Sequence, residues 1–448
     1  MPQPSRRYWV ETLGCPKNHV DSDKLAGTLL ADGYAPAASV KDADLVVVNT
    51  CAFIEPARQE SVDTVLSVRE LVGDDTEIVV TGCMAERYGD ELAEALPEAD
   101  AVRGFGVPVS LGPTRRLATP GDSETTSDPA TTSQFDLLEL PRPASAAPWA
   151  YVKAAEGCDR KCGFCAIPSF RGPQRSRTQA AILAEVEALA AREVVVVAQD
   201  LVSYGRDQGQ GELGLIPLVQ AMAEMVDRVR LLYLYPTGLT DQLIDTIIAT
   251  GVPYFDLSLQ HVSASLLRRM RRTGSMEQVL ERVESIRRRS SDAVFRSNFI
   301  IGYPGETEAD HDQLLRFLEE SDLDWYGLFA YSPEPGTYAE SLPAVPESLV
   351  AERLAEAGEL VDRIMGAKRD KMVGRRIEVL VDAPGVGRSW AEAPEIDGII
   401  ELPGHCDVGE FVDVDITAAR GVDLVGVPVA GNQRATWSSR SNGVVNAQ

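Results

Sequence analysis

Apolar runs and amphipathic stretches alternate along the first 110 residues of the chain. The runs cover residues 8–13, 45–49 and 77–81, and the stretches between them, such as 22–32 and 57–71, carry apolar residues at helical spacing. Strands that alternate with helices favour a parallel sheet covered by helices. The pattern therefore predicts an N-terminal parallel α/β domain over residues 1–111.

This pattern is lost between residues 112 and 147, where Thr, Ser, Pro, Asp and Ala predominate, as in TPGDSETTSDPATTS and PRPASAAP. Such a stretch buries too little apolar surface to offset the entropy that is lost on ordering. We therefore expect residues 112–147 to form a linker.

Strand and helix signals return after the linker. Apolar runs at 151–154, 194–198, 229–235, 254–259, 294–301 and 325–331 are each followed by a helical stretch. This repetition predicts a full or partial β/α barrel, which with its last charged helix spans residues 148–372. Short strands with Gly and Pro turns follow, and they predict a small β-barrel over 373–438 and a frayed tail over 439–448. The fold class is thus a multidomain α/β protein.

The composition and net charge of the chain indicate its cellular location and the kind of partner it binds. The chain is 44% hydrophobic and 25% charged, and no run of about 18 apolar residues could cross a bilayer. The start of the chain has no apolar segment of signal-peptide length, so we expect a cytoplasmic protein. The formal net charge of −25 disfavours a large nucleic-acid footprint and suits a basic protein partner, the other interpretation being that the acidity serves only solubility.

The seven cysteines point to metal or thiol chemistry, because an odd number in a reducing compartment is no disulfide framework. Cys158, Cys162 and Cys165 form a C-x3-C-x2-C arrangement directly after a predicted strand. Three thiolates at this spacing can bind three irons of a 4Fe-4S cluster and leave the fourth iron open. A structural zinc site would need a fourth ligand nearby, and the nearest downstream histidine is His261.

A C-x3-C-x2-C motif with an aromatic residue before its third cysteine resembles the signature of the radical S-adenosylmethionine superfamily. The resemblance implies that Phe164 lies against the adenine and that the methionine part of S-adenosylmethionine binds the open iron. It also implies that residues at later strand ends line the cofactor cavity: Gln199, Ser258, Gln260 and Ile301, with Arg271 as a partner for the cofactor carboxylate. Each of these has another reading, as a cap or turn residue or, for Arg271, as part of a solvated basic helix face.

Cys15, Cys51 and Cys83 each follow a predicted strand by one or two residues. The carboxyl ends of parallel strands lie on one edge of a sheet, where open α/β folds bind ligands, so these thiols should converge. Gly14 and Gly82 would let the backbone approach a bulky group closely. The other interpretation is three buried cysteines that act as small hydrophobic residues. Cys406 has no partner spacing and is predicted to be a core or surface thiol.

Together the two cysteine sets are similar to those of the methylthiotransferase family, which joins an N-terminal three-cysteine domain to a radical barrel and a C-terminal TRAM domain. The segments TLGCPKNHVDSD, CAIPSFRG, VVAQDLVSYG and APEIDG resemble its RimO-type branch. The sister branch that modifies tRNA typically has Gln and Met where this chain has Pro16 and Lys17.

The resemblance implies two 4Fe-4S clusters and methylthio transfer to the β-carbon of one aspartate of small-subunit ribosomal protein S-twelve. No general base of accessible pKa opens such a C–H bond, which explains the need for a radical. Accordingly, no catalytic residue is expected beyond the clusters. An electron donor such as flavodoxin or ferredoxin would reduce the barrel cluster.

The charge of the predicted C-terminal barrel bears on the substrate. Residues 373–430 hold 4 Lys and Arg against 11 Asp and Glu, a balance of −7. We expect acids such as Glu392, Glu395, Asp397 and Glu401 to dock a basic protein loop, whereas a domain that grips tRNA should be basic. Two other functions stay open: a tRNA adenosine methylthiotransferase, and a non-enzymatic iron-sulfur or zinc protein that carries electrons or serves as a scaffold.

Overall fold

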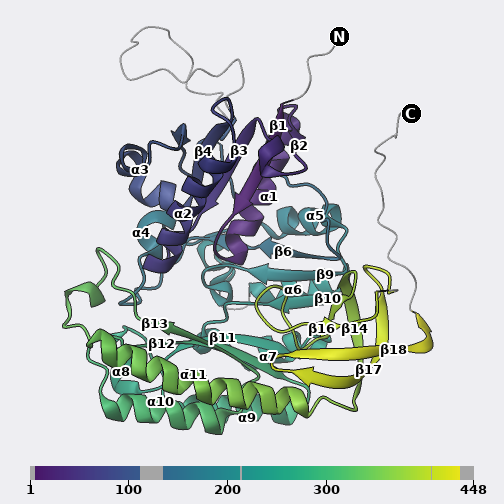
Figure 1. The fold of residues 1–448 in the computed structure, drawn as a ribbon. Coiled ribbons are helices and arrows are strands. Elements are labelled where there is room, and N and C mark those ends of the chain that lie inside the picture. The colour runs from purple at the N-terminus through teal and green to yellow at the C-terminus, as the bar shows by residue number, and fades with distance from the viewer. Residues whose placement is uncertain (1–5, 111–134, 212–213, 405, 434–448) are drawn as a thin grey trace. The chain divides into compact units, whose positions relative to one another are not determined.

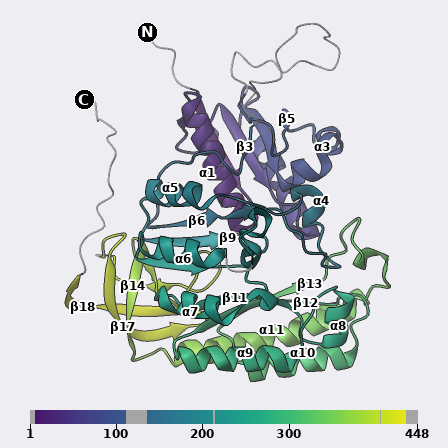
Figure 2. The same ribbon diagram turned by 180° about the vertical axis from the view of Figure 1, so that it is seen from behind.

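The computed structural model describes residues 6–110, 135–211, 214–404 and 406–433 (Figures 1 and 2). The chain divides into two compact units: residues 1–143 with 166–173 form the first, and residues 144–165 with 174–448 form the second. In the described part of the chain, no helix is both long and apolar enough to cross a membrane.

The first unit contains a five-stranded parallel sheet in the order β2-β1-β3-β4-β5. Its strands are β1 (Arg7–Thr12), β2 (Ala35–Pro36), β3 (Leu45–Thr50), β4 (Glu77–Gly82) and β5 (Ala101–Val102). Val46, Val47 and Val48 are all fully buried. Continuous apolar runs of this kind are needed because helices cover both faces of a parallel sheet.

Helix α1 (Pro16–Ala31) packs on one face of this sheet, and α2 (Glu55–Leu71) and α3 (Cys83–Ala95) pack on the other. Leu25 and Leu29 of α1 meet Leu45 and Val47, whereas Val65 of α2 meets the side chains on the opposite face. A short helix, α4 (Ile167–Arg171), contacts α3 (Figure 1). The α/β domain predicted from the sequence is confirmed.

Part of the predicted linker also belongs to the first unit. Residues 112–134 of that linker lie outside the described residues, as does the predicted tail. Leu137 is buried beside Leu45 and Val47, and Arg142 forms an ion pair of 2.8 Å with Asp23. Residues 135–143 therefore cover the first unit.

The second unit contains six parallel strands in chain order. They are β6 (Trp149–Lys153), β9 (Glu193–Val197), β10 (Arg228–Leu231), β11 (Tyr254–Gln260), β12 (Val294–Ile301) and β13 (Trp325–Ala330). The bridge from Leu234 to Leu257 joins the two three-stranded sheets. The partial β/α barrel predicted from the sequence is confirmed.

Helices follow these strands: α5 (Gln179–Leu189), α6 (Leu215–Ala223), α7 (Asp241–Ala249), α8 (Ala264–Arg269), α9 (Met276–Arg289), α10 (Glu308–Ser321) and α11 (Glu347–Asp370). Five of them begin after a Ser or Thr whose side chain accepts a backbone N–H of the first turn: Thr178, Thr240, Ser263, Ser275 and Thr307. These caps explain why the helices start at those residues.

A closed β-barrel completes the second unit. It comprises β14 (Arg376–Ala383), β15 (Val386–Arg388), β16 (Ile400–Glu401), β17 (Phe411–Arg420) and β18 (Asp423–Gln433). Its core includes Val379, Val414 and Ile416, and Cys406 lies in it as a buried thiol. The small C-terminal β-barrel predicted from the sequence is confirmed.

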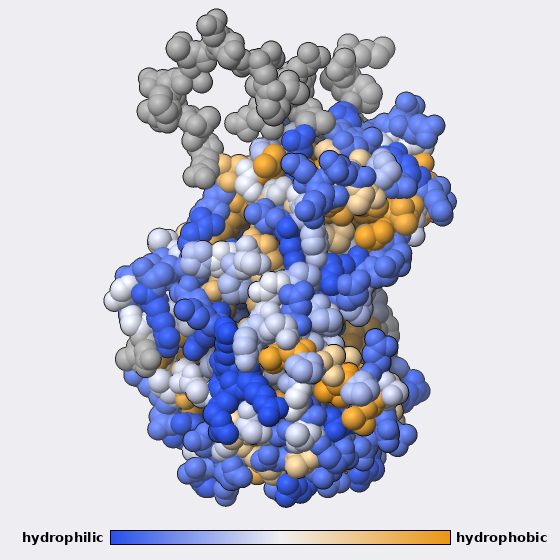
Figure 3. Space-filling view, turned by 90° about the vertical axis from the view of Figure 1, so that its left-hand side faces the viewer, coloured by the Kyte–Doolittle hydropathy of each residue, from blue (hydrophilic) through white to orange (hydrophobic). Residues whose placement is uncertain are grey.

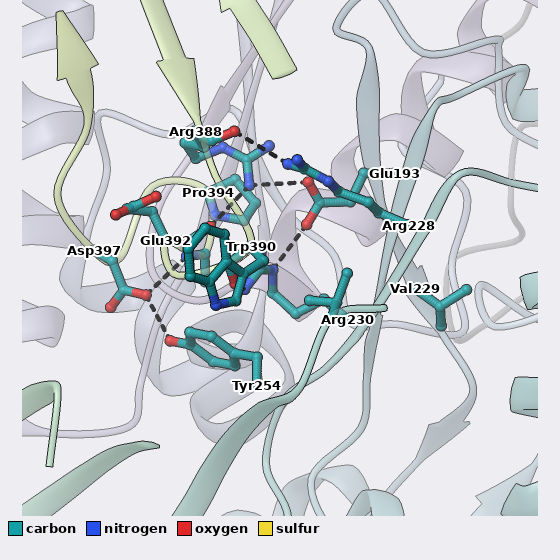
Figure 4. A network of polar contacts seen from close by, with 12 residues as sticks. Glu193, Arg228, Val229, Arg230, Tyr254, Arg388, Trp390, Glu392, Pro394 and Asp397 are labelled. Carbon is teal, nitrogen blue, oxygen red and sulfur yellow. Dashed lines mark hydrogen bonds and ion pairs between the residues drawn. The ribbon is translucent and has the colours of Figure 1, made fainter. Parts of the chain in front are cut away.

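Buried ion pairs attach this β-barrel to the strands of the β/α barrel (Figure 4). Glu193, the first residue of β9, accepts a hydrogen bond from Arg230 of β10 at 2.8 Å and forms an ion pair with Arg388 at 3.2 Å. Tyr254, the first residue of β11, donates to Asp397 at 2.5 Å. Burial alone would raise the pKa of Glu193, but Arg388, Arg230 and Arg228 outweigh it and lower that pKa.

The expectation that Glu392 and Asp397 dock a partner is wrong, because both carboxylates are buried in this attachment. Glu392 accepts from the backbone N–H of Ser389 at 2.8 Å and binds Arg369, and Asp397 accepts from the backbone N–H of Ala393 at 2.8 Å. The count of charges in the sequence did not predict this burial, because it results from packing of residues 388–397 against the strands of the β/α barrel.

The other two acids lie at the surface. Glu395 is exposed, and Glu401 is partly exposed and pairs with Arg420 at 2.7 Å. One face of the molecule is drawn in Figure 3, where hydrophilic residues predominate and hydrophobic residues form separate patches.

Candidate functional site

The three cysteines of the first unit lie together at the carboxyl edge of its sheet. Cys15 precedes the first residue of α1, Cys51 follows β3, and Cys83 begins α3 directly after β4. The Sγ atom of Cys51 lies 2.8 Å from where a Cβ on Gly14 would be, next to Cys15. The charge of either Cys15 or Cys83 as a thiolate also raises the pKa of Cys51. Sheet topology thus unites thiols that are 36 and 32 positions apart in the chain.

The space beside the two glycines is filled by the protein itself rather than left for a bulky group. A Cβ on Gly14 would lie 2.7 Å from Cβ of Cys51, and one on Gly82 would lie 2.3 Å from Oδ1 of Asn49 and 2.6 Å from backbone atoms of Thr50. Both glycines have a φ of +91°. These positions therefore need glycine so that the thiol-bearing loops can pack on one another.

The three thiols differ in how readily they ionise. Burial, with Cys15 and Cys83 nearby, raises the pKa of Cys51 to about 12. Burial also raises the pKa of Cys83, although Arg171 opposes it. For Cys15 burial acts in the same direction, but Lys17 and Arg171 outweigh it and lower the pKa. A bound cation would be needed to hold Cys51 and Cys83 as thiolates.

A buried arginine that sequence reasoning missed completes this site. Arg171 of α4 donates through Nη2 to Sγ of Cys83 at 2.9 Å and to Oδ1 of Asn18 at 2.7 Å. Its Nη1 lies 3.4 Å from Asp21, and its guanidinium stacks on Phe105 at 4.6 Å. Asn18 and Asp21 come from TLGCPKNHVDSD and Arg171 from CAIPSFRG, so these two motifs meet at Cys83.

The second set, Cys158, Cys162 and Cys165, lies on one loop between β7 (Ala155–Glu156) and α4. All three side chains are partly exposed. Burial raises the pKa of Cys158 to about 11, although the backbone N–H of Arg160 donates to its Sγ at 3.4 Å. Among the residues that the structure describes, no group of three or more His, Cys, Asp or Glu is arranged to hold a metal ion by itself. Iron binding by either set stays a prediction.

Backbone hydrogen bonds hold the second loop at Gly163. Its N–H donates to the carbonyl of Met270 at 2.8 Å, and its carbonyl accepts from the N–H of Ala339 at 2.8 Å. A Cβ at this position would lie 2.8 Å from Oη of Tyr303. The glycine in CGFC therefore lets the loop pack against the segments that follow β11 and β13.

Two arginines and a tyrosine form a stack beside the second loop. The guanidiniums of Arg160 and Arg272 lie 3.9 Å and 4.2 Å from the ring centre of Tyr235. Arg160 pairs with Asp200 at 2.7 Å, and Arg272 donates to Sγ of Cys162 at 3.3 Å. Each cysteine set thus has one thiol that accepts from a buried arginine.

The candidate cofactor residues lie at or near the carboxyl ends of their strands. Gln199 follows β9, Gln260 ends β11, and Ile301 ends β12, with Ser258 two residues before the end of β11. Gln199 donates to Glu156 at 2.5 Å, and its buried Oε1 has no hydrogen-bond partner in the described structure. This oxygen is available to a donor group of a ligand. The side chain of Ile301 is fully buried, which leaves only its backbone as a contact.

Phe164 and Arg271 lie on the side of the loop that faces Tyr303 and Tyr338. Phe164 meets Tyr303 edge to face at 6.5 Å, and the exposed Arg271 stacks on Tyr338 at 4.2 Å. Arg271 has a φ of +56°, so the chain leaves helical geometry there and its neighbour Arg272 turns inward. Sequence reasoning missed Arg272 because helical spacing does not apply beyond the end of α8. Roles for these residues toward a cofactor stay predictions.

Comparisons with known proteins cover nearly the whole chain. Residues 7–104 match the family described as "Uncharacterized protein family UPF0004", residues 152–318 the radical SAM superfamily, and residues 373–429 the TRAM domain. A protein of Kineococcus radiotolerans named "Ribosomal protein uS12 methylthiotransferase RimO" is 41% identical, over 95% of this chain and 98% of its own. The protein of the same name from Streptomyces coelicolor is 39% identical, over 98% and 100%.

A solved structure shares the fold. The radical S-adenosylmethionine methyltransferase TsrM from Kitasatospora setae, solved with cobalamin and a [4Fe-4S] cluster, matches with a TM-score of 0.50. It covers 88% of this chain and 82% of its own at 14% identity. The likeness shows a shared fold over most of both chains.

Proposed function

The chain belongs to the RimO family of radical S-adenosylmethionine methylthiotransferases, and from this premise we propose that it transfers a methylthio group to the β-carbon of one aspartate of ribosomal protein uS12, called S-twelve above. The observation that carries the proposal is the identity of about 40% to uS12 methylthiotransferases along nearly the full length of both chains. In addition, the first three-cysteine set stands at the carboxyl ends of parallel strands, and the second lies on the loop that follows β6 and β7.

The donors present fit two iron-sulfur clusters. Each set offers three thiols and one arginine N–H aimed at a sulfur, which suits an anionic group that needs three protein ligands and hydrogen bonds to its sulfurs. When bound, the cluster at Cys158, Cys162 and Cys165 supplies the electron that cleaves S-adenosylmethionine, and the cluster at Cys15, Cys51 and Cys83 supplies sulfur. Phe164, Gln199, Ser258, Gln260, Arg271 and Ile301 would contact S-adenosylmethionine.

Charged and aromatic side chains surround the loop that carries Cys158, Cys162 and Cys165. Arg272 donates to Cys162, and its stacking on Tyr235 holds the guanidinium in place. Asp200 fixes Arg160 on the other face of the same ring. Asp200 thereby holds the positive charge of Arg160 near Cys158, where Arg160 lowers the pKa of the thiol while the carboxylate of Asp200 raises it.

The matched regions support the division of labour predicted from the sequence. We assign the auxiliary cluster to residues 1–111, the radical chemistry to 148–372 and the TRAM domain to 373–438, in agreement with matches at 7–104, 152–318 and 373–429. We place the activity in the cytoplasm with ribosomes, and propose that flavodoxin or ferredoxin reduces the barrel cluster.

The test is a reaction in one vessel under reducing conditions, with reconstituted enzyme, S-adenosylmethionine, purified uS12 and unmodified tRNA. Mass spectrometry should find one methylthio group on one aspartate of uS12 and none on tRNA. The matched control replaces Cys406, a buried thiol of the C-terminal barrel, by Ser and should react like the parent.

The outcomes separate the competing functions. Methylthio groups on tRNA alone would assign the chain to tRNA adenosine modification. A reconstituted protein that does not cleave S-adenosylmethionine would be an iron-sulfur or zinc scaffold instead.

A further inference from the structure

Arg171 is a buried cation with partners around the first cysteine set. Its side chain is 3% exposed, and the carboxylate of Asp21 beside it is 1% exposed. A guanidinium taken out of water costs several kcal/mol unless anions and acceptors surround it. The protein supplies Asp21, Asn18, the ring of Phe105 and a cysteine sulfur as those partners.

The geometry is specific for the sulfur. Nη2 lies 2.9 Å from Sγ of Cys83 while it also donates to Asn18, whose own Nδ2 donates to the carbonyls of Leu13 and Thr50. Asn18 is fully buried and so its orientation is held by both loops. The guanidinium is therefore aimed at Cys83 by a fixed frame rather than by chance contact.

We propose that Arg171 is a positioning residue of the auxiliary site: it holds the Cys83 sulfur and raises the reduction potential of the iron-sulfur group bound there. Asp21 lowers that potential and so opposes Arg171. This inference rests on the proposed function. A nearby positive charge and an N–H directed at a ligand sulfur both favour the reduced, more negative state of such a group. Asp21 has the opposite effect, because its negative charge beside Arg171 disfavours the more negative, reduced state.

We therefore expect substitutions of Arg171 and of Asp21 to shift the reduction potential in opposite directions. Removal of the Arg171 charge should lower the potential, and removal of the Asp21 charge should raise it. A merely structural role for the pair, such as tethering α4 to the sheet, would instead loosen the site in the same direction in both variants.

The experiment isolates the auxiliary group in the full chain by using a parent with Cys158, Cys162 and Cys165 all replaced by Ala. Arg171→Met, Arg171→Lys and Asp21→Asn are then added one at a time, and each protein is reconstituted. Redox titration followed by electron paramagnetic resonance gives the midpoint potential, and iron analysis gives the loading.

We expect Arg171→Met to lower the reduced-to-oxidised ratio at a fixed potential about tenfold, which is about 59 mV for a one-electron couple. Arg171→Lys keeps the charge but not the planar guanidinium, so it should lower this ratio less than Arg171→Met does. If Arg171→Met reduces the iron content, Arg171→Lys should restore it. Asp21→Asn should raise the ratio several-fold. Arg69→Gln is the matched control, because Arg69 pairs with Asp100 in the same unit away from the thiols, and it should leave the potential within twofold.

Each outcome decides the matter. Equal potentials in the parent and the Arg171 variants, or shifts of the same sign in Arg171→Met and Asp21→Asn, would overturn the proposal. If Arg171→Met fails to fold by circular dichroism, Arg171→Lys decides, and an unchanged potential and spectrum there would overturn it. A parent that binds no iron would contradict the auxiliary cluster, and hence the proposed function, before Arg171 is tested.

Discussion

The two cysteine sets reach a similar composition by different routes. Cys158, Cys162 and Cys165 share one partly exposed loop, whose shape follows from short spacing and from backbone bonds at Gly163. Cys15, Cys51 and Cys83 come from three strand ends, and two of them are buried. The first route depends on a local turn, whereas the second depends on correct folding of an entire sheet.

This difference determines how well each site should tolerate substitution. The side chains of the loop set are partly exposed. The strand-end set is enclosed by backbone of neighbouring strands and by buried polar groups such as Asn18 and Asn49. Its geometry is therefore less tolerant of substitution.

Replacement of Cys158, Cys162 and Cys165 together by Ala should have the largest effect. The reconstituted parent should hold about eight irons and the variant about four, because we propose that each set binds one four-iron cluster. Cleavage of S-adenosylmethionine should be lost entirely. Iron analysis and detection of 5′-deoxyadenosine measure both, and a full iron complement in the variant would show that this loop binds no cluster.

Single substitutions in the other set should separate the two half-reactions. Cys15→Ala, Cys51→Ala or Cys83→Ala should reduce methylthio transfer to uS12 by at least about a hundredfold and leave part of S-adenosylmethionine cleavage, since losing a ligand misplaces the sulfur-bearing group. Mass spectrometry of uS12 and detection of 5′-deoxyadenosine provide the readouts. Normal modification by all three variants would make these cysteines simple core residues.

Two glycines test the contrast in tolerance. Gly82→Ala should destabilise the first unit by about 3 to 5 kcal/mol, because it adds a strained φ to a clash with backbone of Thr50. Gly163→Ala should cost about 1 to 2 kcal/mol, because it adds no strained φ and its nearest contact, Oη of Tyr303, belongs to a side chain rather than to the backbone. Hydrogen exchange of peptides from 77–82 and 149–165 would measure both.

Gly33→Ala is the control for this pair. Gly33 has a φ of +88° with nothing within 4 Å of its added Cβ, so it reports strain alone, about 1 to 2 kcal/mol. A cost for Gly82→Ala no greater than that for Gly33→Ala would contradict the enclosed packing of the strand-end set.

The last prediction concerns acid, and the effect should be confined to the second unit. Burial lowers the pKa of His261, next to Gln260, to about 4. An unfolded chain has the ordinary value of about 6.5 and so binds the proton first, which means that stability falls as the pH drops from about 6.5 toward 4.

This loss should amount to roughly 1.4 kcal/mol per pH unit in that window. Urea denaturation of the second unit, followed by hydrogen exchange at pH 7 and pH 5, measures it. His261→Asn should remove that part of the pH dependence, and an unchanged slope in this variant would assign it to other groups.

The sequence predicted the order of the domains and both cysteine sets, because strand periodicity and short spacing are local signals. It could not predict Arg171, whose partner Asp21 lies 150 positions away, nor that Arg272 rather than Arg271 turns toward Cys162. It misplaced Glu392 and Asp397 for the same reason: a charge in the sequence does not reveal whether tertiary packing buries it.

The return of residues 166–173 to the first unit has a consequence for synthesis on the ribosome. Arg171 is translated 88 positions after Cys83, which at about 5 to 20 residues per second is a delay of about 4 to 18 s. During that interval the nascent sheet exists with its thiols and Asp21 but without their cation. The first unit, although it begins the chain, is therefore completed only after translation of the second unit has begun.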